Sequence, residues 1–206
     1  MGGTLITNLL GAVPAGCQID ATRIMQAAMT TNHARLIAIL TAVLVAAALR
    51  LAPHPPNFTP IGAMALFSGA YLTRRSLAFA APLAAMLLSD AVIGFHSGMP
   101  FVYGSVALIV VIGWFALKRV SSLRVVSAAL VSSVLFFVVT NFGTWAVSGM
   151  YPLTLAGLGA CYVAAIPFFQ NTVVGDLFYS GLLFGGFALL ERAVPAIRQG
   201  TEPQPA

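Results

Sequence analysis

Residues 36–49 read LIAILTAVLVAAAL and contain no charged side chain. Similar apolar blocks follow at 77–88, 106–117 and around 134–139. Only 7% of the 206 residues are charged and 59% are hydrophobic, whereas soluble domains carry about 25% charged residues. Long apolar blocks with so few charges belong in lipid or inside a helical bundle. The sequence therefore predicts an all-α integral membrane protein and argues against a soluble enzyme.

Glycine, proline, serine and basic residues divide these blocks into six expected transmembrane helices, at 34–51, 60–72, 77–95, 101–117, 124–147 and 171–191. The second helix, with Thr59 as expected N-cap and Pro60 as first residue, is too short to cross a membrane at ~1.5 Å per residue. The extended stretch 53–59 must then line protein or a watery cavity. Between the last two helices, residues 153–166 are expected to form a short surface or re-entrant helix, because Gly157, Gly159 and Pro167 argue against a seventh span.

This six-helix membrane domain is expected to cover residues 31–194. Residues 1–30 are interpreted as a loosely ordered N-terminal extension and residues 195–206 as a flexible C-terminal tail.

The net charge of +5 arises from basic residues in the short breaks between apolar blocks. Six crossings place nine of the ten Lys and Arg residues on one side of the membrane: Arg23, Arg35, Arg74, Arg75, Lys118, Arg119, Arg124, Arg192 and Arg198. The positive-inside rule makes that side, and with it both termini, cytoplasmic. Because the charges orient the chain and form no binding stripe, no nucleic-acid partner is expected.

Carboxylates inside a membrane are costly and usually face a cavity or a partner, which draws attention to Asp90 and Asp176. The expected topology places both at a similar depth in the outer half, where most of the remaining polar and aromatic candidates also lie. The predicted substrate-binding residues are Asn57, Thr59, Asp90, His96, Asn141, Trp145, Tyr151, Asn171 and Asp176. They could form an outward-facing polar pocket, or they could only cap helices, bond across helices and form an interfacial belt. Their one-sided distribution favours the pocket, because caps and belts should decorate both faces.

Two further patterns leave alternatives open. Arg50 is the lone basic residue outside, and could pair with Asp90 or Asp176, hold an anionic ligand group, or extend to the lipid headgroups. Small residues spaced four apart on the first helix form one stripe, which could pack inside the bundle or dock another membrane subunit. This stripe consists of Ala34, Ala38, Ala42 and Ala46.

The sequence contains no nucleophile–base–acid set, phosphate loop or metal motif. No enzyme activity, cofactor or metal is therefore expected. An intramembrane acid–base pair formed by Asp90 and Asp176 would be the exception, and would require the two carboxylates to lie within about 5 Å of each other.

The stretches PPNFTPIGAMALF at 55–67 and IPFFQNT at 166–172 look like an uncharacterised bacterial membrane family. The outward pocket, the six helices, the alanine stripe and the basic inner turns together resemble the S components of energy-coupling factor transporters, over residues 33–193. Those proteins are membrane subunits that bind vitamins and related micronutrients, and an alanine stripe of this kind faces their coupling subunit. The resemblance implies that Ala34, Ala38, Ala42 and Ala46 dock such a subunit.

Within the S components, its size and solitary look resemble the cobalamin-specific BtuM type, in which a cysteine of the substrate pocket binds cobalt. The third helix has alanine-rich sequence where that cysteine is expected. Either another ligand such as His54 or His96 serves, or the substrate is different.

We therefore expect a membrane-embedded substrate-binding subunit or small transporter in the bacterial cytoplasmic membrane. Its expected partners are the lipid bilayer and a vitamin-like small molecule, for which cobalamin is a candidate, and a membrane coupling subunit is a further candidate partner. The alternative is a structural or assembly membrane protein that transports no ligand.

Overall fold

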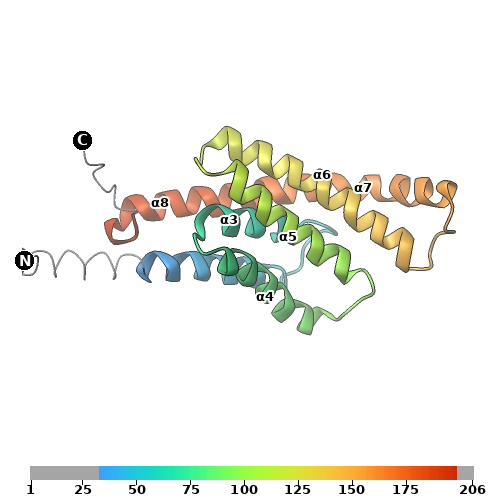
Figure 1. Cartoon of the computed structure of the whole chain (residues 1–206), viewed down its shortest axis with the longest axis horizontal. Helices are drawn as coiled ribbons and strands as arrows, with labels where there is room; N and C mark the ends of the chain where they lie inside the picture. The colour runs from blue at the N-terminus through green and yellow to red at the C-terminus, as the bar shows by residue number, and fades with distance from the viewer. Residues whose placement is uncertain (1–32, 199–206) are drawn as a thin grey trace, which may run out of the picture.

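The computed structural model describes residues 33–198, and every regular element within that range is helical. The described chain begins with the helix His33–Leu49 and continues with α3 (Ile61–Tyr71), α4 (Arg75–Ile93), α5 (Met99–Ala116) and α6 (Ser122–Val147). The last long helix combines α7 (Leu155–Ser180), the π-helical turn η1 (Gly181–Gly185) and α8 (Gly186–Ala193). A short 3-10 turn, η2 (Pro195–Ile197), follows it. The helices form an elongated bundle, with α6 and α7 extending furthest from the chain termini (Figure 1).

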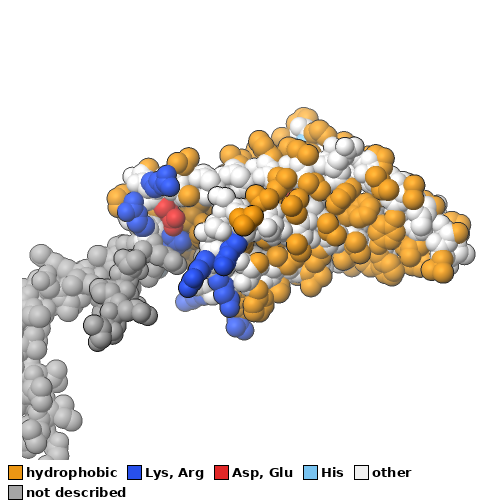
Figure 2. Space-filling model, turned by 90° about the horizontal axis from the view of Figure 1, so that it is seen from above, with side chains coloured by type: hydrophobic (Ala, Val, Ile, Leu, Met, Phe, Trp, Pro, Cys, Tyr) orange, Lys and Arg blue, Asp and Glu red, His pale blue; other side chains and the backbone are white. Residues whose placement is uncertain are grey.

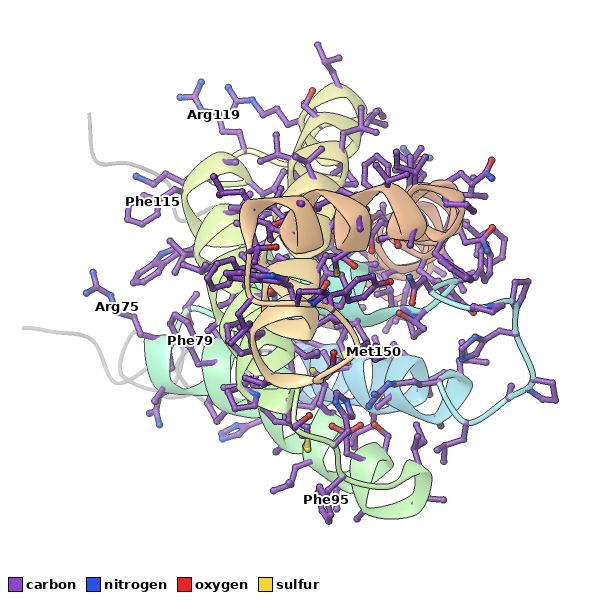
Figure 3. All side chains as sticks on the ribbon, turned by 90° about the vertical axis from the view of Figure 1, so that its right-hand side faces the viewer. Arg75, Phe79, Phe95, Phe115, Arg119 and Met150 are labelled. Carbon is purple, nitrogen blue, oxygen red and sulfur yellow. The ribbon has the colours of Figure 1, made fainter. Side chains whose placement is uncertain are left out.

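Four helices in the described chain are long and apolar enough to cross a membrane: α4, α5, α6 and the continuous helix Leu155–Ala193. Two shorter apolar helices, His33–Leu49 and Ile61–Tyr71, accompany them. Large hydrophobic side chains cover the outside of the bundle, and Figure 3 shows Phe95 and Phe115 pointing away from it. An apolar perimeter of this kind is compatible with a membrane protein.

The basic side chains gather at one end of the bundle, as Figure 2 shows. This basic end contains the turn between α3 and α4, with Arg74 and Arg75, and the turn between α5 and α6, with Lys118 and Arg119. Away from this basic end, in the direction called the far end below, lie the segment 50–60 and the turn between α4 and α5, and the turn between α6 and α7 extends beyond both (Figure 1). Arg50 lies in the segment 50–60, away from the basic end.

Helix α3 is the centre of the bundle, because nine of its eleven residues are buried. It approaches α5 so closely that a Cβ atom on Gly69 would overlap the backbone of Val110, and one on Gly113 would overlap that of Leu66. Glycine at both positions is what allows the two backbones to meet. The ring of Phe67 packs edge-on against the rings of Phe184 and Phe187 in the last helix, at centroid distances of 5.3 and 5.4 Å.

The first five helices lie within two residues of their predicted limits at each end. The predicted cap of α3 was wrong, however, because Pro60 is the N-cap and no side chain caps this helix. Order also extends past the expected boundary at residue 194, since the carbonyl of Ile197 accepts a hydrogen bond of 2.8 Å from Arg35. The predicted extension at 1–30 and residues 199–206 of the predicted tail lie outside the described residues.

The predicted break before the sixth helix was also wrong. Residues 153–166 form no separate surface or re-entrant helix, because α7 starts at Leu155 and continues through Pro167. The Thr154 side chain accepts a hydrogen bond of 3.1 Å from the Gly157 N–H and so caps the first turn. Gly157 is needed there for close packing, because a Cβ atom would overlap the carbonyl of Pro152. Packing against α6 thus outweighs the local preference of glycine and proline for a break.

Candidate functional site

A cavity of about 500 Å³ opens at the far end of the bundle. Its walls come from the segment 50–60, the start of α3, the end of α4, α5, the last turns of α6 and the middle of α7. The lining residues are Arg50, His54, Asn57, Thr59, Ile61, Gly62, Ile93, His96, Val102, Phe136, Phe137, Thr140, Asn141, Thr144, Thr172 and Asp176. A volume of this size suits a drug-sized organic molecule, for which binding pockets measure roughly 300–1,000 Å³.

Arg50 is held at the wall of the cavity by α4. Its guanidinium forms an ion pair with Asp90, at 2.5 Å from Nη1 to Oδ1, and donates a hydrogen bond of 2.6 Å to the Ser89 hydroxyl. The Asp90 carboxylate also accepts a hydrogen bond of 2.7 Å from the hydroxyl of Tyr103 in α5. Asp90 therefore does not line the cavity. Its carboxylate binds Arg50 and Tyr103, and its main effect on the cavity is to fix the position of Arg50.

Asp176 presents the second charged group of the lining. Its side chain is 3% exposed, and Oδ2 lies 2.6 Å from the Ser133 hydroxyl, its hydrogen-bond partner within residues 33–198. Gly62 of α3 faces the same carboxylate, which would overlap a Cβ atom at this position. Asp90 and Asp176 thus have separate partners.

The segment 53–59 forms one wall of the cavity and packs on α7. The backbone of Phe58 and Thr59 lies against Gly175, where a Cβ atom would approach Phe58 Cα and Thr59 N to 3.2 Å. Asn171 Nδ2 donates a hydrogen bond of 3.0 Å to the Pro56 carbonyl. Asn57 adopts a positive φ of 65°, which asparagine tolerates better than most residues. These contacts hold irregular backbone against protein, as the sequence predicts for this stretch.

The lining of α6 combines polar and aromatic groups. Asn141 Nδ2 donates to the Phe137 carbonyl at 2.8 Å, and the Thr140 hydroxyl donates to the Phe136 carbonyl at 2.7 Å. These local bonds use the Thr140 hydroxyl hydrogen and one of the two Asn141 amide hydrogens, so Thr140 keeps an acceptor oxygen and Asn141 keeps an acceptor oxygen and a second amide hydrogen. Together with the rings of Phe136 and Phe137, they offer hydrogen bonding and apolar contact on the same wall.

The sequence of this chain matches DUF6580, a family of unknown function, over residues 30–197. The chain belongs to DUF6580. Neither a curated protein nor a solved structure matches it.

Five of the nine predicted binding residues line the cavity of this DUF6580 protein: Asn57, Thr59, His96, Asn141 and Asp176. The other four lie outside the lining. Asp90 acts through Arg50, and Asn171 fastens the segment 53–59 to α7. Trp145 donates a hydrogen bond of 2.9 Å from Nε1 to the carbonyl of Pro152, across the turn between α6 and α7, and Tyr151 belongs to the same turn.

The predicted set of binding residues did not include several uncharged residues that line the cavity, notably Gly62, Phe136, Phe137 and Thr140. A helical pattern could have found Thr140, because it stands four residues before Thr144 and next to Asn141. No comparable signal marked Gly62, whose role appears only where α3 meets α7.

The predicted docking stripe lies on the other side of this DUF6580 chain. Ala38, Ala42 and Ala46 line an apolar groove of about 440 Å³ between the first described helix and the last one. The opposite wall of the groove is formed by residues of the last helix such as Leu183 and Phe187. No group of three or more possible metal ligands occurs within the described range of the chain.

Proposed function

We propose that this DUF6580 chain captures a vitamin-like small molecule in the cavity at the far end, either as the substrate-binding subunit of a transporter or as a small transporter itself. The observation that carries the proposal is the cavity of about 500 Å³, with its mixed polar, charged and aromatic lining. Its polar and charged lining distinguishes this cavity from the apolar groove between the first described helix and the last one.

The lining favours a ligand that carries both polar and flat apolar parts. Arg50 and Asp176 offer one positive and one acidic group, Thr140 offers an acceptor, and Asn141 offers both an acceptor and a donor. Phe136 and Phe137 favour a ring system. Cobalamin is a weaker candidate than a smaller micronutrient, because its corrin ring with the attached nucleotide is much larger than a drug-sized molecule. In addition, Cys161 lies outside the lining.

We propose further that the chain crosses the bacterial cytoplasmic membrane six times, with the basic end and both termini in the cytoplasm. The collection of Arg74, Arg75, Lys118 and Arg119 at one end supports this orientation. The first described helix and α3 are short for a full crossing, and the segment 50–60 completes the path of the chain between them. The cavity then opens to the outside.

We also propose that the groove lined by Ala38, Ala42 and Ala46 receives a membrane coupling subunit, with Ala34 on the same stripe. This idea follows the resemblance to S components and is supported by the small side chains, which allow close helix approach.

The deciding experiment asks which small molecule co-purifies with the protein from cells grown in rich medium. Mass spectrometry of the detergent-solubilised chain should detect a compound that is lost from the variant Thr140→Phe, which places a bulky ring at the cavity wall. The matched control is Val138→Phe, two residues away on the exposed surface of α6, which should retain the compound. Repeated recovery of lipid alone from all three proteins would favour the structural or assembly alternative.

A further inference from the structure

A second cavity, of about 510 Å³, lies at the basic end between the start of α6 and the last helix. It is lined by Ser121 and Val125 on one side and by Ser180, Phe184 and Arg192 on the other. The π-helical turn η1 forms part of its wall through Gly181 and Gly185. Such turns locally widen a helix and often occur at functional sites.

The two cavities are separated by a single turn of α7. Asp176 lines the cavity at the far end and Ser180 lines the cavity at the basic end. The two residues are four positions apart, which corresponds to a rise of about 6 Å on the same face of the helix. Thr172 continues this polar stripe toward the far end, and all three side chains are buried.

Ser180 also has unused hydrogen-bonding capacity at this junction. Its side chain is 1% exposed, and its hydroxyl has no hydrogen-bond partner in the part of the chain that the structure describes. A buried hydroxyl without a partner is costly, and of the three such serines in the described residues, Ser68, Ser132 and Ser180, only Ser180 lines one of the two cavities. Water or a hydrated proton would satisfy it.

The hydrogen bonds around Asp176 can accommodate a proton on its carboxyl group. The single hydroxyl proton of Ser133 faces two acceptors, Asp176 Oδ2 at 2.6 Å and the Ala129 carbonyl at 3.0 Å. An ionised Asp176 would leave one of these contacts without a hydrogen. A protonated carboxyl donates to the Ser133 oxygen, which in turn donates to Ala129, and both contacts are satisfied.

Few positively charged groups near Asp176 could neutralise its carboxylate in place of a bound proton. Of the elements that pack against it, α3 presents Gly62 and α6 presents Ser133. The charged and titratable groups that share its cavity are Arg50, His54 and His96, and Arg50 is already paired with Asp90. A buried carboxylate without a cation partner is unfavourable, and the bound proton removes that cost.

We propose that Asp176 is a proton-binding site between the two cavities, which receives a proton from the far end and releases it toward Ser180 at the basic end. Release leaves the carboxylate, and the next proton from the far end restores the acid. The inference rests on the proposed function in one respect: the cavity that supplies the proton is the one proposed to bind the solute. The proton site itself can be tested without knowing the solute.

Infrared difference spectroscopy of the full chain in lipid tests the site directly. The wild type should show the C=O stretching band of a protonated carboxyl, which disappears as the pH is raised. Asp176→Asn should lack the band. Ser133→Ala should shift the band, because the carboxyl loses its hydrogen-bond partner. The proposal is overturned if the wild type has no such band, or if Asp176→Asn leaves it unchanged.

Thiol labelling tests the release route. Gly181 has free space for a Cβ atom and lines the cavity at the basic end, so Gly181→Cys should react with a membrane-impermeant maleimide from that side. Gly104→Cys is the matched control, because Gly104 also has free space but lies on the outer surface of α5, away from both cavities. Equal, low reactivity of the two variants would overturn the route. Failure to find a co-purifying solute, with the infrared band present, would instead count against the proposed function alone.

Discussion

Arg50 and Asp90 form an ion pair that ties the end of the first described helix to α4, with 2.5 Å between Nη1 and Oδ1. The side chain of Asp90 is almost completely buried, and that of Arg50 is 12% exposed. The charge that lines the cavity is therefore positioned by a partner outside it. Asp90 and Asp176 thus differ in role, although the sequence predicts both as binding residues.

We expect Asp90→Asn to destabilise the protein by about 3–5 kcal/mol, because it leaves the Arg50 guanidinium without its countercharge. Thermal unfolding in detergent measures the loss. The double variant Arg50→Gln/Asp90→Asn should recover part of it, since no unpaired charge is left. An Asp90→Asn protein that melts at the wild-type temperature would contradict the assigned pair.

Gly62→Ala should be destabilising by roughly 1–3 kcal/mol, because the added Cβ atom overlaps the Asp176 carboxylate and forces α3 and α7 apart. Gly104→Ala provides the comparison. It adds the same methyl group to a helix with free space around it and should stabilise by about 0.5–1 kcal/mol. Melting curves of both variants measure the two changes in stability. Equal changes in melting temperature would contradict the close contact between Gly62 and Asp176.

Trp145→Phe should cost about 1 kcal/mol of stability through loss of the hydrogen bond to Pro152. The amount of any co-purifying small molecule should not change, since Trp145 does not line the cavity. Mass spectrometry and thermal unfolding of the same preparation provide both values. If Trp145→Phe lost the small molecule while its melting temperature stayed normal, Trp145 would have to contact the ligand.

The continuity of α7 can be measured with spin labels at Gly159→Cys and Phe178→Cys, two exposed positions nineteen residues apart. An unbroken helix separates their Cα atoms by about 28 Å. Pulsed electron paramagnetic resonance reports this distance. A distance several ångströms shorter would indicate a break at Pro167 and restore a separate helix before the last span.

The proposed orientation makes opposite predictions for two exposed turns. In a chain whose Cys17 and Cys161 are replaced by serine, Ser122→Cys should react with an impermeant maleimide only after cell lysis. Ser97→Cys should react on intact cells, because it lies in the turn between α4 and α5 at the far end. Reversed labelling would invert the membrane orientation.

The positions of the helices could be predicted because apolar runs end at clear signals. Pro53, the pair Arg74 and Arg75, and the Lys118–Arg119 turn all mark boundaries that local chemistry determines. Pro167 could not be interpreted in the same way. Whether a proline ends a helix or remains inside it depends on neighbouring helices, and α6 supplies those contacts to α7.

The candidate site could be predicted only in part, for a related reason. Polar residues such as Asp176 and Asn141 stand out in an apolar sequence, because burying them is costly. Their orientation around each helix depends on packing, and Trp145 shows the limit. It shares α6 with Asn141, yet its ring reaches the turn to α7 instead of the cavity.

Helix α3 has a consequence for how the protein is made. Its eleven residues span about 16 Å, roughly half of the hydrocarbon core of a bilayer, so it cannot insert as an independent segment. It is synthesised early, but the helices that bury it, α5 and α7, emerge from the ribosome later. In the proposed membrane topology, α3 has no stable position until those helices are present. We therefore expect its final placement to follow the insertion of the outer helices that enclose it.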